Sequence, residues 1–163
     1  MILRDAGAMA AALPARGALF GLDLGTKTLG IAVCDPGWHI ASPLQTLTRT
    51  KFTRDAADLF ALMDARAAVG LVLGWPREMD GTEGRRCQAT RSFANNLLKS
   101  RDVPLLLWDE RLSTSAVERM MVREFDMSRQ KRAARVDAAA AAYILQGALD
   151  ALARQGPAGG SDR

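Results

Sequence analysis

The sequence is poor in the residues from which zinc sites and disulfide frameworks are built. Its 163 residues include two cysteines, far apart and without a CxxC pair, and a single histidine. Zinc sites need clustered Cys and His, and disulfide scaffolds need several spaced cysteines, so neither class is expected. We interpret Cys34 and Cys87 as small buried side chains of a protein that works in a reducing compartment.

Long apolar runs are also missing. No stretch approaches the roughly 18 apolar residues that span a bilayer, so we expect no membrane-spanning segment and no membrane partner. The first 17 residues are rich in alanine and include two arginines, but an acid and the low hydrophobicity argue against an export signal. We therefore expect a flexible extension over residues 1–17, one folded domain over residues 18–154 and a disordered tail over residues 155–163.

The composition that remains is globular and basic. Hydrophobic residues make up 48% and charged residues 25%, which suits a single domain with its own core. The formal net charge of +4 favours polyanionic partners such as nucleic acid, although an excess of Arg also occurs on ordinary solvated surfaces.

Residues 19–34, LFGLDLGTKTLGIAVC, predict two adjacent strands with one apolar face and one nearly bare face. Asp23 belongs to the bare face, together with small residues: Gly21, Gly25, Gly30, Ala32 and Cys34. A buried carboxylate is costly unless a cation or strong hydrogen bonds compensate it. Lys27 in the intervening turn offers a cation, and the alternative is a hairpin in which Asp23 caps its own turn.

The rest of the chain predicts an α/β fold with a mixed sheet. A third strand completes an antiparallel meander, and two short apolar runs, each preceded by a helical pattern, predict parallel buried strands. The expected strands lie at 19–24, 29–34, 41–48, 69–74 and 103–108, and the main helices at 53–68 and 136–154. The architecture is therefore a three-strand meander extended by two parallel strands, five in all.

Further acids follow the last strand and open the last helix. Asp109 and Glu110 end the strand on opposite faces by alternation, so only one of them can join Asp23. Asp137 lies on the stripe of the final helix that faces the sheet, and a plain helix N-terminal acid is the alternative. Three converging carboxylates need a cation, and oxygen ligands without His or Cys suit Mg²⁺ or Mn²⁺. Two such ions can activate water for phosphodiester hydrolysis.

Basic residues accompany these acids. A basic loop precedes Asp137, and it would hold a phosphate backbone unless it is only solvated surface. We assign nucleic-acid contacts to seven cations near the acids: Lys27, Arg77, Arg111, Arg129, Lys131, Arg132 and Arg135.

Four motifs then resemble a known family. GLDLGTKTLGIAVCD, GWPREMDGTEG, WDERLST and SRQKRAARVDAAAAAYILQGALD, in this order and spacing, are similar to the YqgF family of RNase H-like proteins, related to Holliday junction resolvases. The resemblance covers about residues 18–152. It implies a ribonuclease H-like fold with helices on both faces of the five-stranded sheet. It also implies that Asp23, Glu110 and Asp137 are the catalytic acids and metal ligands, with Asp109 as the alternative to Glu110.

The resemblance implies a hydrolase acting on ester bonds, a pre-16S rRNA nuclease in cytoplasmic ribosomal RNA maturation. The expected partners are precursor rRNA or branched DNA, with ribosome association, for a monomer or homodimer. A Holliday junction resolvase would use the same acids on another substrate, and a non-catalytic nucleic-acid-binding module would carry them as relics. An actin-like or sugar-kinase ATPase is disfavoured because 163 residues leave no room for a second lobe.

Overall fold

The structure is a computed structural model that describes residues 1–77, 80–109 and 129–155, with the backbone alone for residues 129–137. These residues form the following elements in chain order: β1 (Ile2–Leu3), α1 (Ala6–Ala12), β2 (Ala18–Leu24), β3 (Thr28–Cys34), β4 (Ala41–Thr48), α2 (Phe52–Ala65), β5 (Ala68–Trp75), α3 (Arg85–Ser100), β6 (Leu105–Asp109) and α5 (Arg129–Arg154).

The strands of the described residues form one mixed sheet in the order β1-β6-β5-β2-β3-β4. β2, β3 and β4 are an antiparallel meander, and β5 pairs parallel with β2 on the other side. β6 pairs parallel with β5, and β1 with β6. The predicted meander and the two parallel strands are confirmed, and the sheet has six strands instead of the expected five because β1 extends it.

The N-terminal segment differs from the expected flexible extension. Ile2 pairs with Leu105 of β6, and α1 packs against the sheet with Met9 fully buried. Asp5 caps α1 by accepting a hydrogen bond of 2.8 Å from the backbone N–H of Ala8. Met9 and Leu13 of this segment are buried in the core, and the surrounding alanines hide their spacing in the sequence.

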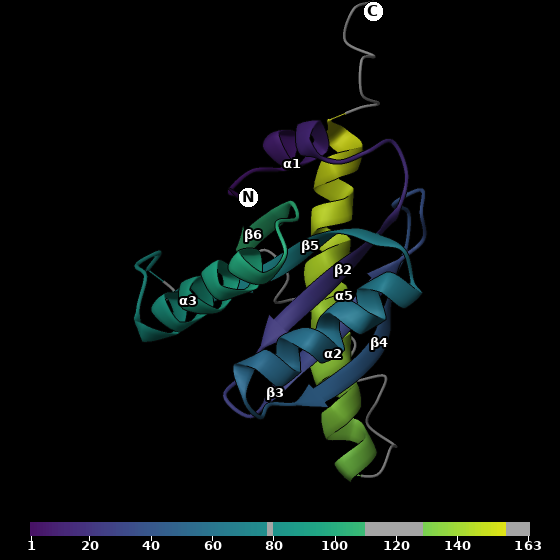
Figure 1. Cartoon of the computed structure of the whole chain (residues 1–163). Helices are drawn as coiled ribbons and strands as arrows, with labels where there is room; N and C mark the ends of the chain where they lie inside the picture. Colours follow the sequence, from purple (N-terminus) through teal and green to yellow (C-terminus); the bar gives the residue numbers. More distant parts are fainter. Residues whose placement is uncertain (78–79, 110–128, 156–163) are drawn as a thin grey trace, which may run out of the picture.

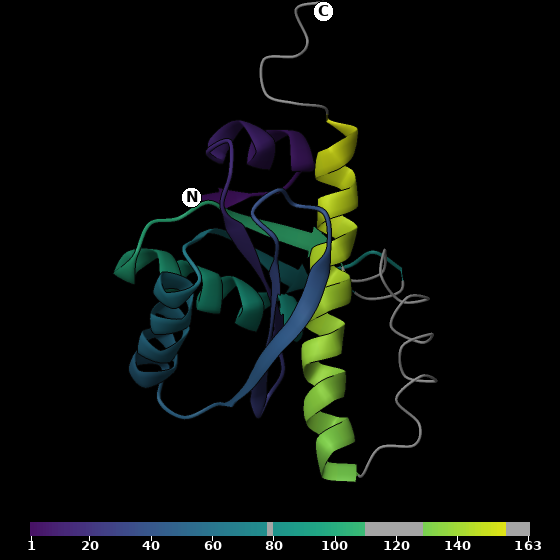
Figure 2. The same ribbon diagram turned by 90° about the vertical axis from the view of Figure 1, so that its right-hand side faces the viewer.

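Helices cover both faces of the sheet, as Figures 1 and 2 show. α2 and α3 pack on the face formed by the large alternating residues of the strands, such as Phe20, Leu22 and Leu71. α1 and α5 pack on the opposite face, which the strands build from smaller residues such as Ala32 and Cys34. Two apolar cores therefore lie on either side of the sheet, and each strand contributes to both.

The bare face predicted around Asp23 is where α5 lies. A Cβ added to Gly21 would stand 2.6 Å from the carbonyl oxygen of Ala141 and 2.6 Å from Cβ of Leu145. The predicted sheet-facing stripe of this helix is confirmed, because Ala141, Ile144 and Ala148 are buried in the core beneath it. Glycine on the strand and alanine on the helix thus allow the helix backbone to approach the sheet closely.

α5 begins at Arg129, seven residues before the predicted start, so the expected basic loop is incorrect for residues 129–135. Arg, Gln, Lys and Ala form helices readily, and no Gly or Pro interrupts this stretch. The basic residues therefore occupy the first turns of the helix that carries Asp137. Ser115 with Glu118 forms a capping box that also predicts a helix; this segment and residues 156–163 of the expected tail lie outside the described residues.

The close approach at Gly21 gives a testable expectation. Gly21→Ala should lower the free energy of unfolding by about 3 kcal/mol, because the added methyl group meets a backbone carbonyl that cannot move without lifting α5. Gly7→Ala is the matched control, since its Cβ would meet only side-chain ends of Asp5 and Gln155 at 3.2 Å. Urea unfolding of both variants measures the difference, and equal midpoints would contradict the packing described here.

Candidate functional site

Asp23 lies near the carboxyl end of β2, half-buried, on the face that α5 covers. Its partner on β3 is Gly30. On the other side Leu22 is level with Leu73 of β5, so the residue level with Asp23 is Gly74. Glycines on both neighbouring strands leave space beside the carboxylate on this face. The strand carboxylate predicted from the sequence therefore lies at the carboxyl end of a central strand, between two residues without side chains.

The acids after β6 divide between the two faces. Asp109 pairs with Trp75 at the end of β6. It stands two and four residues after Leu107 and Leu105, whose side chains belong to the core under α2 and α3. Alternation thus places Asp109 on the face opposite to Asp23. Glu110 and Arg111 lie outside the described residues.

The helix that carries Asp137 passes over the site end of β2. Gly21 faces Ala141, and position 137 is one helical turn earlier. β2 and α5 run in opposite senses, so the N-terminal half of α5 lies toward the end of β2 that bears Asp23 (Figure 1). The backbone of α5 at position 137 therefore lies toward the end of β2 that bears Asp23.

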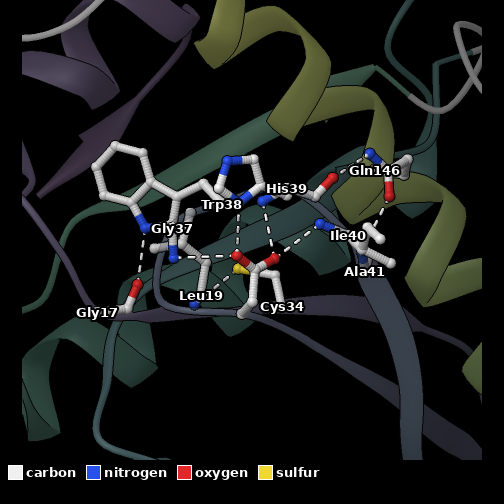
Figure 3. Close-up of polar contacts among 10 residues, drawn as sticks. Gly17, Leu19, Cys34, Gly37, Trp38, His39, Ile40, Ala41 and Gln146 are labelled. Carbon is white, nitrogen blue, oxygen red and sulfur yellow. Dashed lines mark hydrogen bonds and ion pairs between the residues drawn. The ribbon is translucent and has the colours of Figure 1, made fainter.

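Polar contacts fix α5 against the β3–β4 connection (Figure 3). Gln146 on α5 accepts a hydrogen bond of 2.9 Å from the N–H of Ala41 and donates one of 3.1 Å to the carbonyl of His39. The connection itself is held by Asp35, whose carboxylate accepts the N–H groups of His39 and Ile40 at 2.8 Å each. These hydrogen bonds, that of Ile40 above all, keep the pKa of Asp35 well below its usual range.

An arginine that sequence reasoning missed lies over the β2–β3 turn. Lys27 is exposed in this turn, and its carbonyl accepts the N–H of Arg49 at 2.8 Å. The guanidinium of Arg49 donates to the carbonyl of Gly25 at 2.6 Å, two residues after Asp23. No local motif signals Arg49, because only the antiparallel return of β4 brings it here.

The other predicted cations are described in part. Arg77 follows β5 and pairs with Glu83 at 3.4 Å. Four basic positions open α5, on the backbone that leads to Asp137: Arg129, Lys131, Arg132 and Arg135. The structure thus gathers Lys27, Arg49 and Arg77 on the loops that follow β2, β4 and β5.

Thiol chemistry does not fit this protein. Burial raises the pKa of Cys34 to about 11, and its Sγ accepts the N–H of Leu19 at 3.3 Å. Burial also raises the pKa of Cys87. Both thiols are therefore protonated and inert near neutral pH, as expected for structural cysteines.

The described residues contain neither a metal-binding cluster nor a membrane-spanning helix. No group of three or more His, Cys, Asp or Glu side chains within that part of the chain is placed to hold a metal ion. Of the three predicted acids, only Asp23 has its side chain among the described atoms. None of the described helices is long and apolar enough to cross a membrane.

The mixed sheet and the helices on its two faces have the arrangement of a ribonuclease H-like fold. Thermus thermophilus RuvC in complex with a Holliday junction substrate is similar with a TM-score of 0.59 and 14% identity, over 86% of this chain and 96% of its own. The yeast mitochondrial Holliday junction resolvase is similar with a TM-score of 0.54 and 14% identity, over 92% of this chain and 85% of its own. At these identities the similarity shows the fold alone.

The family follows from the sequence comparisons. A family model described as "RuvX: Holliday junction resolvase" matches residues 17–151, and the chain belongs to this RuvX, or YqgF, family. A relative from Rhodospirillum rubrum is 64% identical over 90% of this chain and 91% of its own. A relative from Sphingopyxis alaskensis is 55% identical over 94% of this chain and its own full length. Both are named "Putative pre-16S rRNA nuclease".

Proposed function

We propose that this protein is a metal-dependent endonuclease that hydrolyses phosphodiester bonds in the maturation of the 5′ end of pre-16S rRNA. One structural observation carries the catalytic part of the proposal. Asp23 stands between Gly30 and Gly74, on the face over which α5 brings the segment of Asp137. The names of the relatives support the substrate.

The acids fit a hard divalent cation. We assign Asp23, Glu110 and Asp137 as ligands of Mg²⁺ or Mn²⁺ in a site of the two-metal type, since carboxylate oxygens are the donors these ions prefer. Asp109 belongs to the opposite face, which supports Glu110 as the partner of Asp23. When bound, the ions supply an activated water and neutralise the charge that develops on the phosphate.

The chain's own contribution is to hold the substrate. Lys27 and Arg49 beside the β2–β3 turn would contact phosphates next to the cleaved bond, and Arg77 after β5 would contact the same strand farther from that bond. Arg111 and the basic first turns of α5 would extend this contact along the strand: Arg129, Lys131, Arg132 and Arg135. Contacts of this kind position a backbone without reading its sequence. We place the activity in the cytoplasm, on ribosome-associated precursor rRNA, with a monomer or homodimer as the active form.

Cleavage of a four-way DNA junction is the second candidate function. The RuvX description and the fold shared with Holliday junction resolvases favour it. The same acids would serve both reactions, so the two functions differ in the shape of the substrate. A non-catalytic binding module is the third reading, and the presence of all three acids counts against it.

Incubation with both substrates tests the proposal. Purified protein with Mg²⁺ or Mn²⁺ should cut precursor 16S rRNA near its mature 5′ end, and chelator should stop the reaction. A four-way junction of equal concentration serves as the competing substrate. Faster cleavage of the junction would assign the resolvase activity instead, and no cleavage of either substrate would leave only the binding module.

A further inference from the structure

Three arginines surround one carboxylate at the carboxyl end of β5. Glu83 accepts hydrogen bonds from Arg4 and Arg77 at 3.4 Å each and from Arg91 at 3.3 Å. The indole N–H of Trp75 donates to the same carboxylate at 3.2 Å. The four partners come from the N-terminal segment, β5, the β5–α3 connection and α3, so this arginine cluster exists only in the folded chain.

The arginine cluster has more positive charge than its own acid can neutralise. Three guanidiniums share one carboxylate, which leaves an excess of two positive charges. Each ion pair is a single long contact, whereas strong arginine–carboxylate pairs are short and bidentate. The side chains of Arg4 and Arg91 are 48% exposed and that of Arg77 is 33% exposed. The exposed parts of Arg4 and Arg91 can therefore donate to a second anion, whereas Nε of Arg77 is buried.

The ring of Trp75 gives these arginines a rigid support. The guanidinium carbons of Arg4 and Arg91 lie 5.1 and 5.2 Å from its centroid, within the range of cation–π attraction. Trp75 itself is only 2% exposed. Arginines stacked on a fixed ring lose less conformational freedom when they bind an anion than freely moving ones.

Neighbouring groups strengthen the positive field. α3 begins after Gly84 with no side-chain cap and no acid in its first turn, where Arg85 and Arg86 add two more cations. Asp80 of the same connection, whose Oδ1 accepts both the N–H and the hydroxyl of Thr82, keeps its negative charge and offsets part of this field.

The arginine cluster lies next to the candidate site but on the other face of the sheet. Trp75 follows Gly74, the residue level with Asp23, and its side chain belongs to the α2–α3 core. Strand spacing and rise place the Cα atoms of Asp23 and Trp75 about 6 Å apart. A nucleic-acid strand cut at Asp23 and led round this edge of the sheet would therefore reach the arginine cluster within a few nucleotides.

We propose that Arg4, Arg77 and Arg91 bind a backbone phosphate of the substrate on the far side of the sheet edge from the cleaved bond. Glu83 and Trp75 hold the three guanidiniums in place, and the phosphate takes their remaining donors. The inference rests on the proposed nuclease function and extends it, since it makes the N-terminal segment part of the substrate site. Guanidinium forks suit phosphate because two N–H groups can bind two of its oxygens.

The test uses an Arg4→Gln, Arg91→Gln double variant and a labelled single-stranded RNA in chelator, so that no strand is cut. Each lost single-strand contact should reduce the slope of log affinity against log salt by about 0.7, or about 1.4 for two. Arg66→Gln with Arg154→Gln is the control, because it removes equal charge from exposed residues at the end of α2 and the end of α5. Its slope should change by less than about 0.7.

A second measurement separates binding from a merely structural role. If the arginine cluster only fastens the N-terminal segment, the double variant melts at a lower temperature with an unchanged salt slope, and the inference is overturned. Should the double variant not fold, Arg4→Gln alone carries the test, with an expected slope change of about 0.7. Wild-type protein that neither binds nor cuts nucleic acid would instead overturn the proposed function, which an unchanged slope in the variant would not.

Discussion

Asp23→Asn should lower the rate of metal-dependent cleavage by at least about a thousandfold, which corresponds to about 4 kcal/mol of transition-state stabilisation. The substitution keeps the shape of the side chain and removes the charge that holds the cation. The variant should melt at or above the wild-type temperature without metal, because clustered carboxylates repel one another. Single-turnover cleavage of precursor rRNA, together with thermal melting, measures both effects.

Two other acids serve as controls for this result. Asp58→Asn changes an exposed acid of α2 and should cleave at the wild-type rate. Asp109→Asn is the sharper control, because Asp109 lies one residue from the proposed ligand Glu110 but on the opposite face from Asp23. It should keep most of the activity. If Asp23→Asn cleaves at the wild-type rate, Asp23 is not a residue of the active site. If Asp109→Asn has no activity, Asp109 is the metal ligand instead of Glu110.

The part of the fold nearest Asp23 could be predicted because its signals are local. Alternation of large and small residues over 19–34 predicts which residues form each face of β2 and β3. The bare face is the one on which α5 packs. The stripe of Ala141, Ile144 and Ala148 likewise gave the buried side of that helix. Patterns of period two and period 3.6 carry this information within a single element.

The remaining features depend on contacts between segments far apart in the chain. β1 is two residues long, and it is a strand only because it pairs with β6. Arg49 reaches the site through the register of β4, and the arginine cluster assembles from segments that run from Arg4 to Arg91. Local residue preferences carry no information about contacts between distant segments, so the sequence pattern alone does not predict these pairings.

Metal identity should separate a nuclease from a binding module more sharply than any single substitution. The two hypotheses share the fold, the basic surface and the partner, and they differ in what the carboxylates must do. Alignment of water and phosphate needs a small cation with strict octahedral geometry, whereas Ca²⁺ has longer bonds and variable coordination. We therefore expect cleavage with Mg²⁺ or Mn²⁺, and binding without cleavage with Ca²⁺.

Glu110→Gln and Asp137→Asn should each reproduce the calcium result, with RNA bound at nearly wild-type affinity and no cleavage in Mg²⁺. Each variant removes one ligand charge and leaves the cations of the phosphate contacts in place. Binding by fluorescence anisotropy and cleavage by gel, on the same RNA, give the two readouts. If the protein binds rRNA equally well in chelator, cuts nothing with any metal and is indifferent to all three acid substitutions, the carboxylates are relics and the binding module is the correct function.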